Sequence, residues 1–128
     1  MKCDYLIKNK DGLSTYFEER LECSESNSKF DKQYLRIDLR VSEAKDYAEL
    51  TKMFEIKVLD SKTGLRELKL DKIRCIHFLY LNNTFVFLGT FIKKTGKTPP
   101  NEINKNNERI IEYIKQQAIG GEKNDNYR

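Results

Sequence analysis

Two long apolar runs separated by a very short polar turn constrain this fold more than any other feature of the chain. Residues 73–81 and 84–92 are rich in aliphatic and aromatic side chains, and Asn82-Asn83 lies between them. Because asparagine tolerates the positive φ of a tight turn, the pattern predicts a hairpin of two antiparallel strands. Both runs are apolar on both faces, so we expect central strands with both sides covered.

Shorter patterns predict the elements that precede this hairpin. Residues 3–9 form an apolar stretch that predicts a first strand, ended by a turn at Lys10-Asp11-Gly12. Residues 13–21 have the apolar spacing of a short helix. From residue 56 the period changes. Residues 56–59 are interpreted as a strand or an extended lead-in, and residues 65–70 predict a further strand.

A helical stripe lies between these segments. Its apolar members recur at steps of three and four: Phe30, Tyr34, Ile37, Val41 and Ala44. The pattern continues to about Met53, with a break near Ser42. We interpret the stripe as core packing against the sheet.

After the hairpin the chain becomes basic and then helical. Lys93 to Pro100 is a basic loop that ends in two prolines, which suit the first turn of a helix because their missing N–H leaves no donor unpaired. An amphipathic helix is predicted to about Ala118, where Gly120-Gly121 ends it. We therefore expect one domain over residues 1–118 and a flexible polar tail over 119–128.

The predicted order of elements is β-α-α-β-β-β-α, an α+β fold. A small antiparallel sheet would carry N-terminal helices and a C-terminal helix. We expect the helices to pack on one face of the sheet and the other face to lack a helix. Basic side chains on the strands and on the loop after the last strand would line that open face.

The composition excludes several classes of protein. The 128 residues suit a single domain, and no apolar run approaches the roughly 18 residues that span a bilayer. The chain begins without a long apolar stretch, so we expect a soluble, cytoplasmic protein with no membrane partner. Cys3, Cys23 and Cys75 form no CxxC pair, which argues against a disulfide framework and a zinc site. We expect no metal and no small-molecule cofactor.

The positive charge is concentrated in one part of the chain. The formal net charge is only +4, but residues 57–97 contain nine basic and three acidic residues. Residues 1–56 have a net charge of −2, and residues 98–128 contain five residues of each sign. The excess charge therefore lies on the predicted strands and the following loop, which suggests a polyanionic partner.

Six basic residues make up most of this excess: Arg66, Lys69, Arg74, Lys93, Lys94 and Lys97. Composition alone would make them a solvated face. Arg74 needs another explanation because it lies inside an apolar strand, where a charge is costly unless it is paired or faces an open groove. Strand alternation places Arg74 on the face of Tyr80 and turns His77 to the other face, where we interpret it as a hydrogen-bonded core histidine.

Three stretches of this half carry a family pattern. They are GLRELKL at 64–70, IRCIH at 73–77 and FVFLGTFIKKTGKTP at 85–99. They resemble the RelE/HigB toxin superfamily, and most closely its phage-derived HigB-type branch, which typically has gLyELR, then yRvlY, then LLhgFxKKtqKTP before a charged helix. The resemblance covers roughly residues 57–118 and implies a RelE-like microbial RNase fold.

The resemblance also implies a function. Such proteins are toxins of type II toxin–antitoxin systems, and they cleave mRNA in the 30S A site of the ribosome without a metal, causing translation inhibition and growth arrest. The ribose 2′-hydroxyl attacks the adjacent phosphate, so the site needs positive groups, a base and an acid. A helix-turn-helix antitoxin encoded by the neighbouring gene is the implied protein partner.

Site residues carry over by position. Arg74 matches the strand arginine and would stabilise the phosphate, since guanidinium can hold phosphate through two hydrogen bonds. Further catalytic candidates are Lys93 and Lys94 of the paired lysines and Lys69, which stands where the branch has arginine. The RNA-binding candidates are Arg66, Lys97, Phe91 and Tyr80, of which Phe91 could equally be a core residue.

The sequence departs from the family pattern at two places. His77 stands where tyrosine is common, and Gly89-Thr90 replaces the usual His-Gly. The base would then be a lysine, a tyrosine such as Tyr80 or Tyr113, or electrostatics alone. The alternative is a non-catalytic module of the RelE/ParE fold that binds RNA, gyrase or a partner protein.

Overall fold

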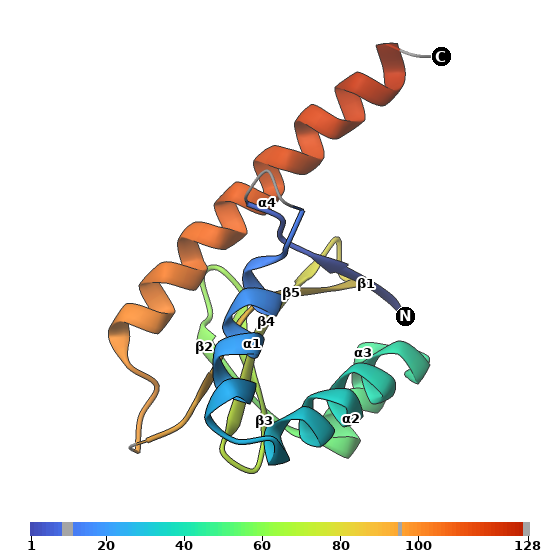
Figure 1. The fold of residues 1–128 in the computed structure, drawn as a ribbon. Coiled ribbons are helices and arrows are strands. Elements are labelled where there is room, and N and C mark those ends of the chain that lie inside the picture. The colour runs from blue at the N-terminus through green and yellow to red at the C-terminus, as the bar shows by residue number, and fades with distance from the viewer. Residues whose placement is uncertain (9–11, 95, 127–128) are drawn as a thin grey trace.

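The computed structural model describes residues 1–8, 12–94 and 96–126, with side chains up to residue 119. Helices cover both faces of a five-stranded sheet (Figure 1). The elements follow in the order β1 (Lys2–Tyr5), α1 (Thr15–Ser26), α2 (Lys29–Glu43), α3 (Tyr47–Met53), β2 (Glu55–Asp60), β3 (Leu65–Leu70), β4 (Ile73–Tyr80), β5 (Thr84–Ile92) and α4 (Pro100–Asn126). The predicted α+β fold is confirmed, with two elements more than the predicted order. Residues 55–60 form a strand of their own, and the helical stripe is divided between α2 and α3.

The sheet is mixed rather than wholly antiparallel. Its strand order is β1-β5-β4-β3-β2, in which β2 to β5 form an antiparallel meander. β1 pairs in parallel with β5, so that Lys2 lies opposite Thr84 and Tyr5 opposite Phe87. Parallel pairing is possible here because the long connection between these two strands contains three helices and strands β2 to β4.

The hairpin of β4 and β5 lies inside the sheet as predicted, but its turn is shifted by one residue. Tyr80 pairs with Thr84, and the two central turn residues with positive φ are Leu81 (52°) and Asn82 (62°). Asn83 instead donates its N–H to the Tyr80 carbonyl at 3.3 Å. The strand register therefore forces a leucine into a backbone conformation that asparagine adopts more easily.

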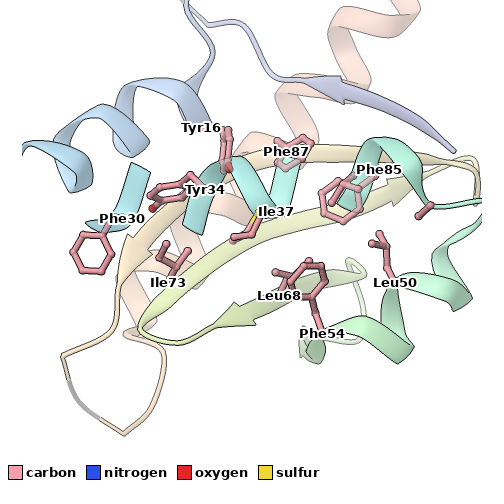
Figure 2. Close-up of a cluster of buried hydrophobic side chains, with 13 residues drawn as sticks. Tyr16, Phe30, Tyr34, Ile37, Leu50, Phe54, Leu68, Ile73, Phe85 and Phe87 are labelled. Carbon is pink, nitrogen blue, oxygen red and sulfur yellow. The ribbon is translucent and has the colours of Figure 1, made fainter. Parts of the chain in front are cut away.

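One core lies between the sheet and helices α1 to α3. All five members of the predicted stripe are buried there, together with aromatic residues that include Tyr16, Phe85 and Phe87 (Figure 2). The predicted helix break is also confirmed, because α2 ends at Glu43 and Asp46 caps the N-terminus of α3 by accepting from the Glu49 N–H at 2.9 Å. The core-packing interpretation of the stripe is therefore confirmed.

A second core lies on the opposite face, which we expected to lack a helix; that expectation is wrong. Ile110 and Tyr113 of α4 pack on this face with sheet residues such as Ile76, Val86 and Leu88, all of them buried. The physical reason is that strands apolar on both faces would otherwise leave large side chains in water, and burying each is worth about 1.5–3 kcal/mol.

The chain ends differ in detail from the prediction. β1 spans only Lys2–Tyr5, and the residues Lys10 and Asp11 of the predicted turn lie outside the described residues. The last helix runs to Asn126 instead of ending at Gly120-Gly121. Glycine costs a helix about 1 kcal/mol relative to alanine but does not by itself end it. No helix in the described ranges has both the length and the hydropathy needed to cross a membrane.

Candidate nucleic-acid interface

The basic loop after β5 surrounds a small hollow. Lys93, Lys94 and Lys97 line it together with Phe91 and Pro99, and its volume is about 100 Å³. The loop is tied to the sheet at its start, where the Lys93 N–H donates to the Lys72 carbonyl at 2.8 Å. The structure thus brings together four residues that the sequence singled out, three cations and one aromatic ring. We call this the basic hollow.

A row of cross-strand neighbours joins the basic hollow to the sheet. Arg74 on β4 lies directly opposite Lys69 on β3 and opposite Phe91 on β5. Directly opposite side chains of an antiparallel pair have Cβ atoms about 5 Å apart. Lys69 is three-quarters buried and forms an ion pair with Glu55 at 3.3 Å. Six of the eight candidate residues therefore lie in this row or in the basic hollow beside it.

The Arg74 side chain is buried but keeps donors free. It is only 7% exposed, and its Nη1 donates to the carbonyls of Asp71 at 2.7 Å and Ile73 at 2.9 Å. Within the described residues no carboxylate lies within ion-pairing distance of it, and no acceptor bonds its Nε or Nη2. The carbonyls offset part of the cost of burying the charge and hold the guanidinium rigidly. The remaining donors could bind an anion.

Two predicted RNA-binding residues lie elsewhere. Arg66 is on the opposite face, where its guanidinium lies 5.0 Å from the centre of the Tyr47 ring. Strand alternation explains this, since Arg66 is an odd number of positions from Lys69. Tyr80 packs edge-on against Tyr113 with ring centres 5.3 Å apart, at the far end of β4. Six residues of strand, roughly 20 Å, separate it from Arg74.

His77 is a core histidine, as interpreted from the sequence. It is fully buried on the α2–α3 side, its Nε2 lies 2.7 Å from the Tyr47 hydroxyl, and its Nδ1 lies 3.1 Å from the Cys75 carbonyl. Its ring stacks on Phe85 with centres 4.2 Å apart. Burial lowers the pKa of His77 to about 3, with nearby Arg66 acting in the same direction. It cannot serve as a base in the basic hollow.

Tyr113 is equally unsuited to act as a base. Its hydroxyl donates to the Asp4 carboxylate, and burial together with that carboxylate raises its pKa well above the usual value of a tyrosine. A phenol with a raised pKa stays protonated near neutral pH. It also contacts Phe78 and Tyr80 at the end of the sheet remote from Arg74.

An ionic network occupies the space beside Gly89, where the resembled branch has histidine. The Glu19 carboxylate accepts from Arg109 and Lys105, each at 2.7 Å, and from the Thr90 N–H at 3.3 Å. A Cβ at position 89 would lie 2.5 Å from both the Arg109 guanidinium and the Glu19 carboxylate. The glycine is therefore required for this network, and no side chain fits there without displacing it.

Glu67 is a site residue that sequence reasoning did not single out. It is 2% exposed, and the Thr98 hydroxyl of the basic loop donates to its Oε1. The available signal was strand alternation, which places Glu67 on the same face as Lys69 and hence beside Arg74. The contact itself joins residues 31 positions apart and has no local signature.

One comparison with known proteins gives a match. The family model described as "Phage derived protein Gp49-like (DUF891)" matches residues 29–110, from the start of α2 into α4. The matched segment includes the strand row and the entire basic loop. No curated protein matches the chain.

Proposed function

Because this chain belongs to the Gp49-like phage-derived protein family, which is a family of RelE/HigB-type toxins, we propose that it is a type II toxin that cleaves mRNA on the ribosome. The observation that carries the proposal is the basic hollow, in which three lysines surround Phe91 one strand away from Arg74. Cytoplasmic mRNA in the 30S A site is the proposed substrate, and translation inhibition the proposed effect.

The chemistry follows from the charges and from the free Arg74 donors. The ribose 2′-hydroxyl attacks the neighbouring phosphate while the bond from phosphorus to the 5′-oxygen breaks, which gives a 2′,3′-cyclic phosphate and a free 5′-hydroxyl. The negative charge on the phosphate oxygens grows in the transition state. Nε and Nη2 of Arg74 bind that phosphate, and Lys93, Lys94 and Lys97 add positive charge around it. Phe91 packs against the second core but is only partly buried, and its ring would stack with an unstacked base. A lysine of the loop or a ribosomal group takes the proton of the 2′-hydroxyl, and another such group gives a proton to the leaving 5′-oxygen.

The test is induced expression in a bacterium that lacks the antitoxin. Wild-type protein is expected to arrest growth with cleaved mRNA, and Lys94→Ala and Lys97→Ala, which alter exposed side chains, are expected to relieve both effects. Lys52→Ala on α3 is the matched control and is expected to remain toxic. Arg74→Ala should also abolish cleavage, with circular dichroism confirming that the buried substitution still folds. Normal growth with abundant wild-type protein would refute the proposal.

We further propose a helix-turn-helix antitoxin as the partner protein. Its gene would adjoin this one, and the positive excess over residues 57–97 would speed association with an acidic partner. Co-expression of the two genes is expected to give a complex that survives size exclusion chromatography. Two separately eluting proteins would contradict this part of the proposal.

A non-catalytic binding function is the second candidate. It is favoured by the space beside Gly89, which the Glu19–Arg109 network fills so that a histidine there would have to displace it. A module of this kind would bind RNA, gyrase or another protein without cleaving transcripts. Growth arrest with intact mRNA and damaged DNA would identify gyrase as the target, whereas cleaved mRNA would exclude this candidate.

A further inference from the structure

Glu67 is an acidic side chain buried on the basic face of the sheet. It lies on β3 opposite Ile76 and is 2% exposed. Within the described residues, no lysine or arginine lies within ion-pairing distance of its carboxylate. Burying a carboxylate without a cation is costly, so the position demands a reason beyond packing.

The contact that Glu67 makes supplies that reason. Its Oε1 accepts from the hydroxyl of Thr98, the residue that follows Lys97 in the basic loop. At the other end of the loop the Lys93 N–H donates to the Lys72 carbonyl at 2.8 Å. The loop is therefore tied to the sheet at both ends, once through the backbone and once through Glu67.

A tie at the second end is needed because the loop repels itself. Lys93, Lys94 and Lys97 all line one hollow of about 100 Å³. Like charges that are crowded in this way repel one another and favour an extended conformation of the chain. The negative charge of Glu67 also opposes that repulsion. A hydrogen bond to a charged acceptor is stronger than one between neutral groups. The Thr98–Glu67 contact is therefore suited to holding the loop closed against the repulsion between its lysines.

The start of α4 does not need this contact. The Pro99 carbonyl already accepts from the Glu102 N–H at 3.0 Å and from the Ile103 N–H at 3.3 Å, so the first helical turn closes by itself. Glu67 is therefore more than a helix cap for α4, and its contact acts on the loop.

We propose that Glu67 is a positioning residue that latches the basic loop through Thr98 and so holds the three lysines around Phe91 for binding single-stranded RNA. The part of this inference that concerns RNA binding rests on the proposed function, whereas the latch, the contact between Glu67 and Thr98 that holds the loop, does not. Without the latch, the loop lysines are free to separate, and fewer of them contact neighbouring phosphates at the same time.

The first experiment measures the latch without RNA, by amide hydrogen exchange of the full chain. Thr98→Val removes the hydroxyl, and Thr98→Ser retains it. Thr63→Val is the matched control: the Thr63 hydroxyl donates to the Asn107 side-chain oxygen over a distance of 2.8 Å, and neither residue belongs to the basic loop. We expect Thr98→Val to speed exchange of the Lys93 amide, which donates to the Lys72 carbonyl, several-fold while β4 exchanges as before. Thr98→Ser and Thr63→Val should match the wild type in the loop.

The second experiment measures binding of a fluorescein-labelled oligouridylate by anisotropy at several salt concentrations. Each phosphate contact contributes about 0.7 to the slope of log K against log salt for a single strand. We expect Thr98→Val to weaken binding several-fold and to lower the slope by one or two such steps, with Thr98→Ser restoring both. Glu67→Gln should weaken binding less than Thr98→Val does, because the glutamine amide oxygen can still accept from the Thr98 hydroxyl.

Different outcomes refute different parts. Unchanged loop exchange in Thr98→Val would overturn the latch. Faster exchange with an unchanged affinity and salt slope would overturn the positioning role. If the wild type binds no RNA, the proposed function and the RNA-binding part of this inference both fail. Amide hydrogen exchange of Thr98→Val and of the wild type still decides whether Glu67 holds the loop.

Discussion

His77 is expected to make the stability of this protein depend on pH above the range in which carboxylates titrate. It is the only histidine of the chain and lies fully buried between Tyr47, Cys75 and Phe85. Burial favours its neutral form and lowers its pKa from 6.5 to about 3, the Cys75 carbonyl opposes this shift, and the positive charge of Arg66 adds to it. The perturbation is acidification from about pH 7 to about pH 5.

The sign of the effect follows from the two pKa values. Between pH 6.5 and about 3 the unfolded chain binds a proton on His77 that the folded chain does not bind. The free energy of unfolding therefore falls as the pH falls through this window. Each full pH unit is worth about 1.4 kcal/mol, which gives a loss of about 2 kcal/mol by about pH 5.

The assay is urea denaturation followed by circular dichroism at both pH values. Wild-type protein is expected to lose about 2 kcal/mol of unfolding free energy, and His77→Phe, which retains the stacking on Phe85, is expected to lose almost none. The matched control is Tyr47→Phe, which removes the hydroxyl that contacts His77 Nε2 but keeps the titrating ring. This control should lose as much unfolding free energy between the two pH values as the wild type does, but its unfolding free energy should be lower at both.

One result would refute the reasoning about His77. If His77→Phe loses as much stability as the wild type between the two pH values, another group causes the pH dependence. The buried neutral imidazole would then contribute nothing to it.

Two further substitutions test contacts of the sheet. Gly89→Ala places a Cβ 2.5 Å from Arg109 and Glu19, so thermal denaturation should show a loss of about 2 kcal/mol or more, while Gly96→Ala, which meets nothing within 4 Å, should change stability by less than about 0.5 kcal/mol; equal effects would contradict the steric argument. Leu81→Asn should stabilise the hairpin by about 1 kcal/mol in the same assay, because residue 81 has a φ of 52° and leucine is strained there; a loss of stability would show that exposed Leu81 makes a contact of its own.

Most of the fold could be predicted because the deciding information is local. The stripe from Phe30 to Ala44 has the 3.6-residue period of a helix, and the runs 73–81 and 84–92 are long, apolar and separated by a turn. These periods predict helix or strand from the segment itself, without information about the rest of the chain. The turn at Leu81 was misplaced by one residue because the strand register, which the sequence does not specify, decides which residues take positive φ.

The site could be predicted only in part. Phe91, Lys93, Lys94 and Lys97 are close in sequence and share one hollow, so the motif alone was enough to group them. Arg66 has the same charge and lies only three positions from Lys69, yet it faces α3. The alternation of strand side chains separates the two, and a list of basic residues ignores it.

The sequence by itself determined where most helices and strands lie, that β4 and β5 are interior strands, and that positive charge gathers on the strands and loop of residues 57–97. Only the tertiary structure decided that α4 covers the second face, that Lys69, Arg74 and Phe91 form one row, and that Glu67 meets Thr98. The physical reason is that periodicity reflects how each side chain faces water or core, which is a local property. Register and helix docking reflect the sum of many contacts between distant residues, and no short segment contains that sum.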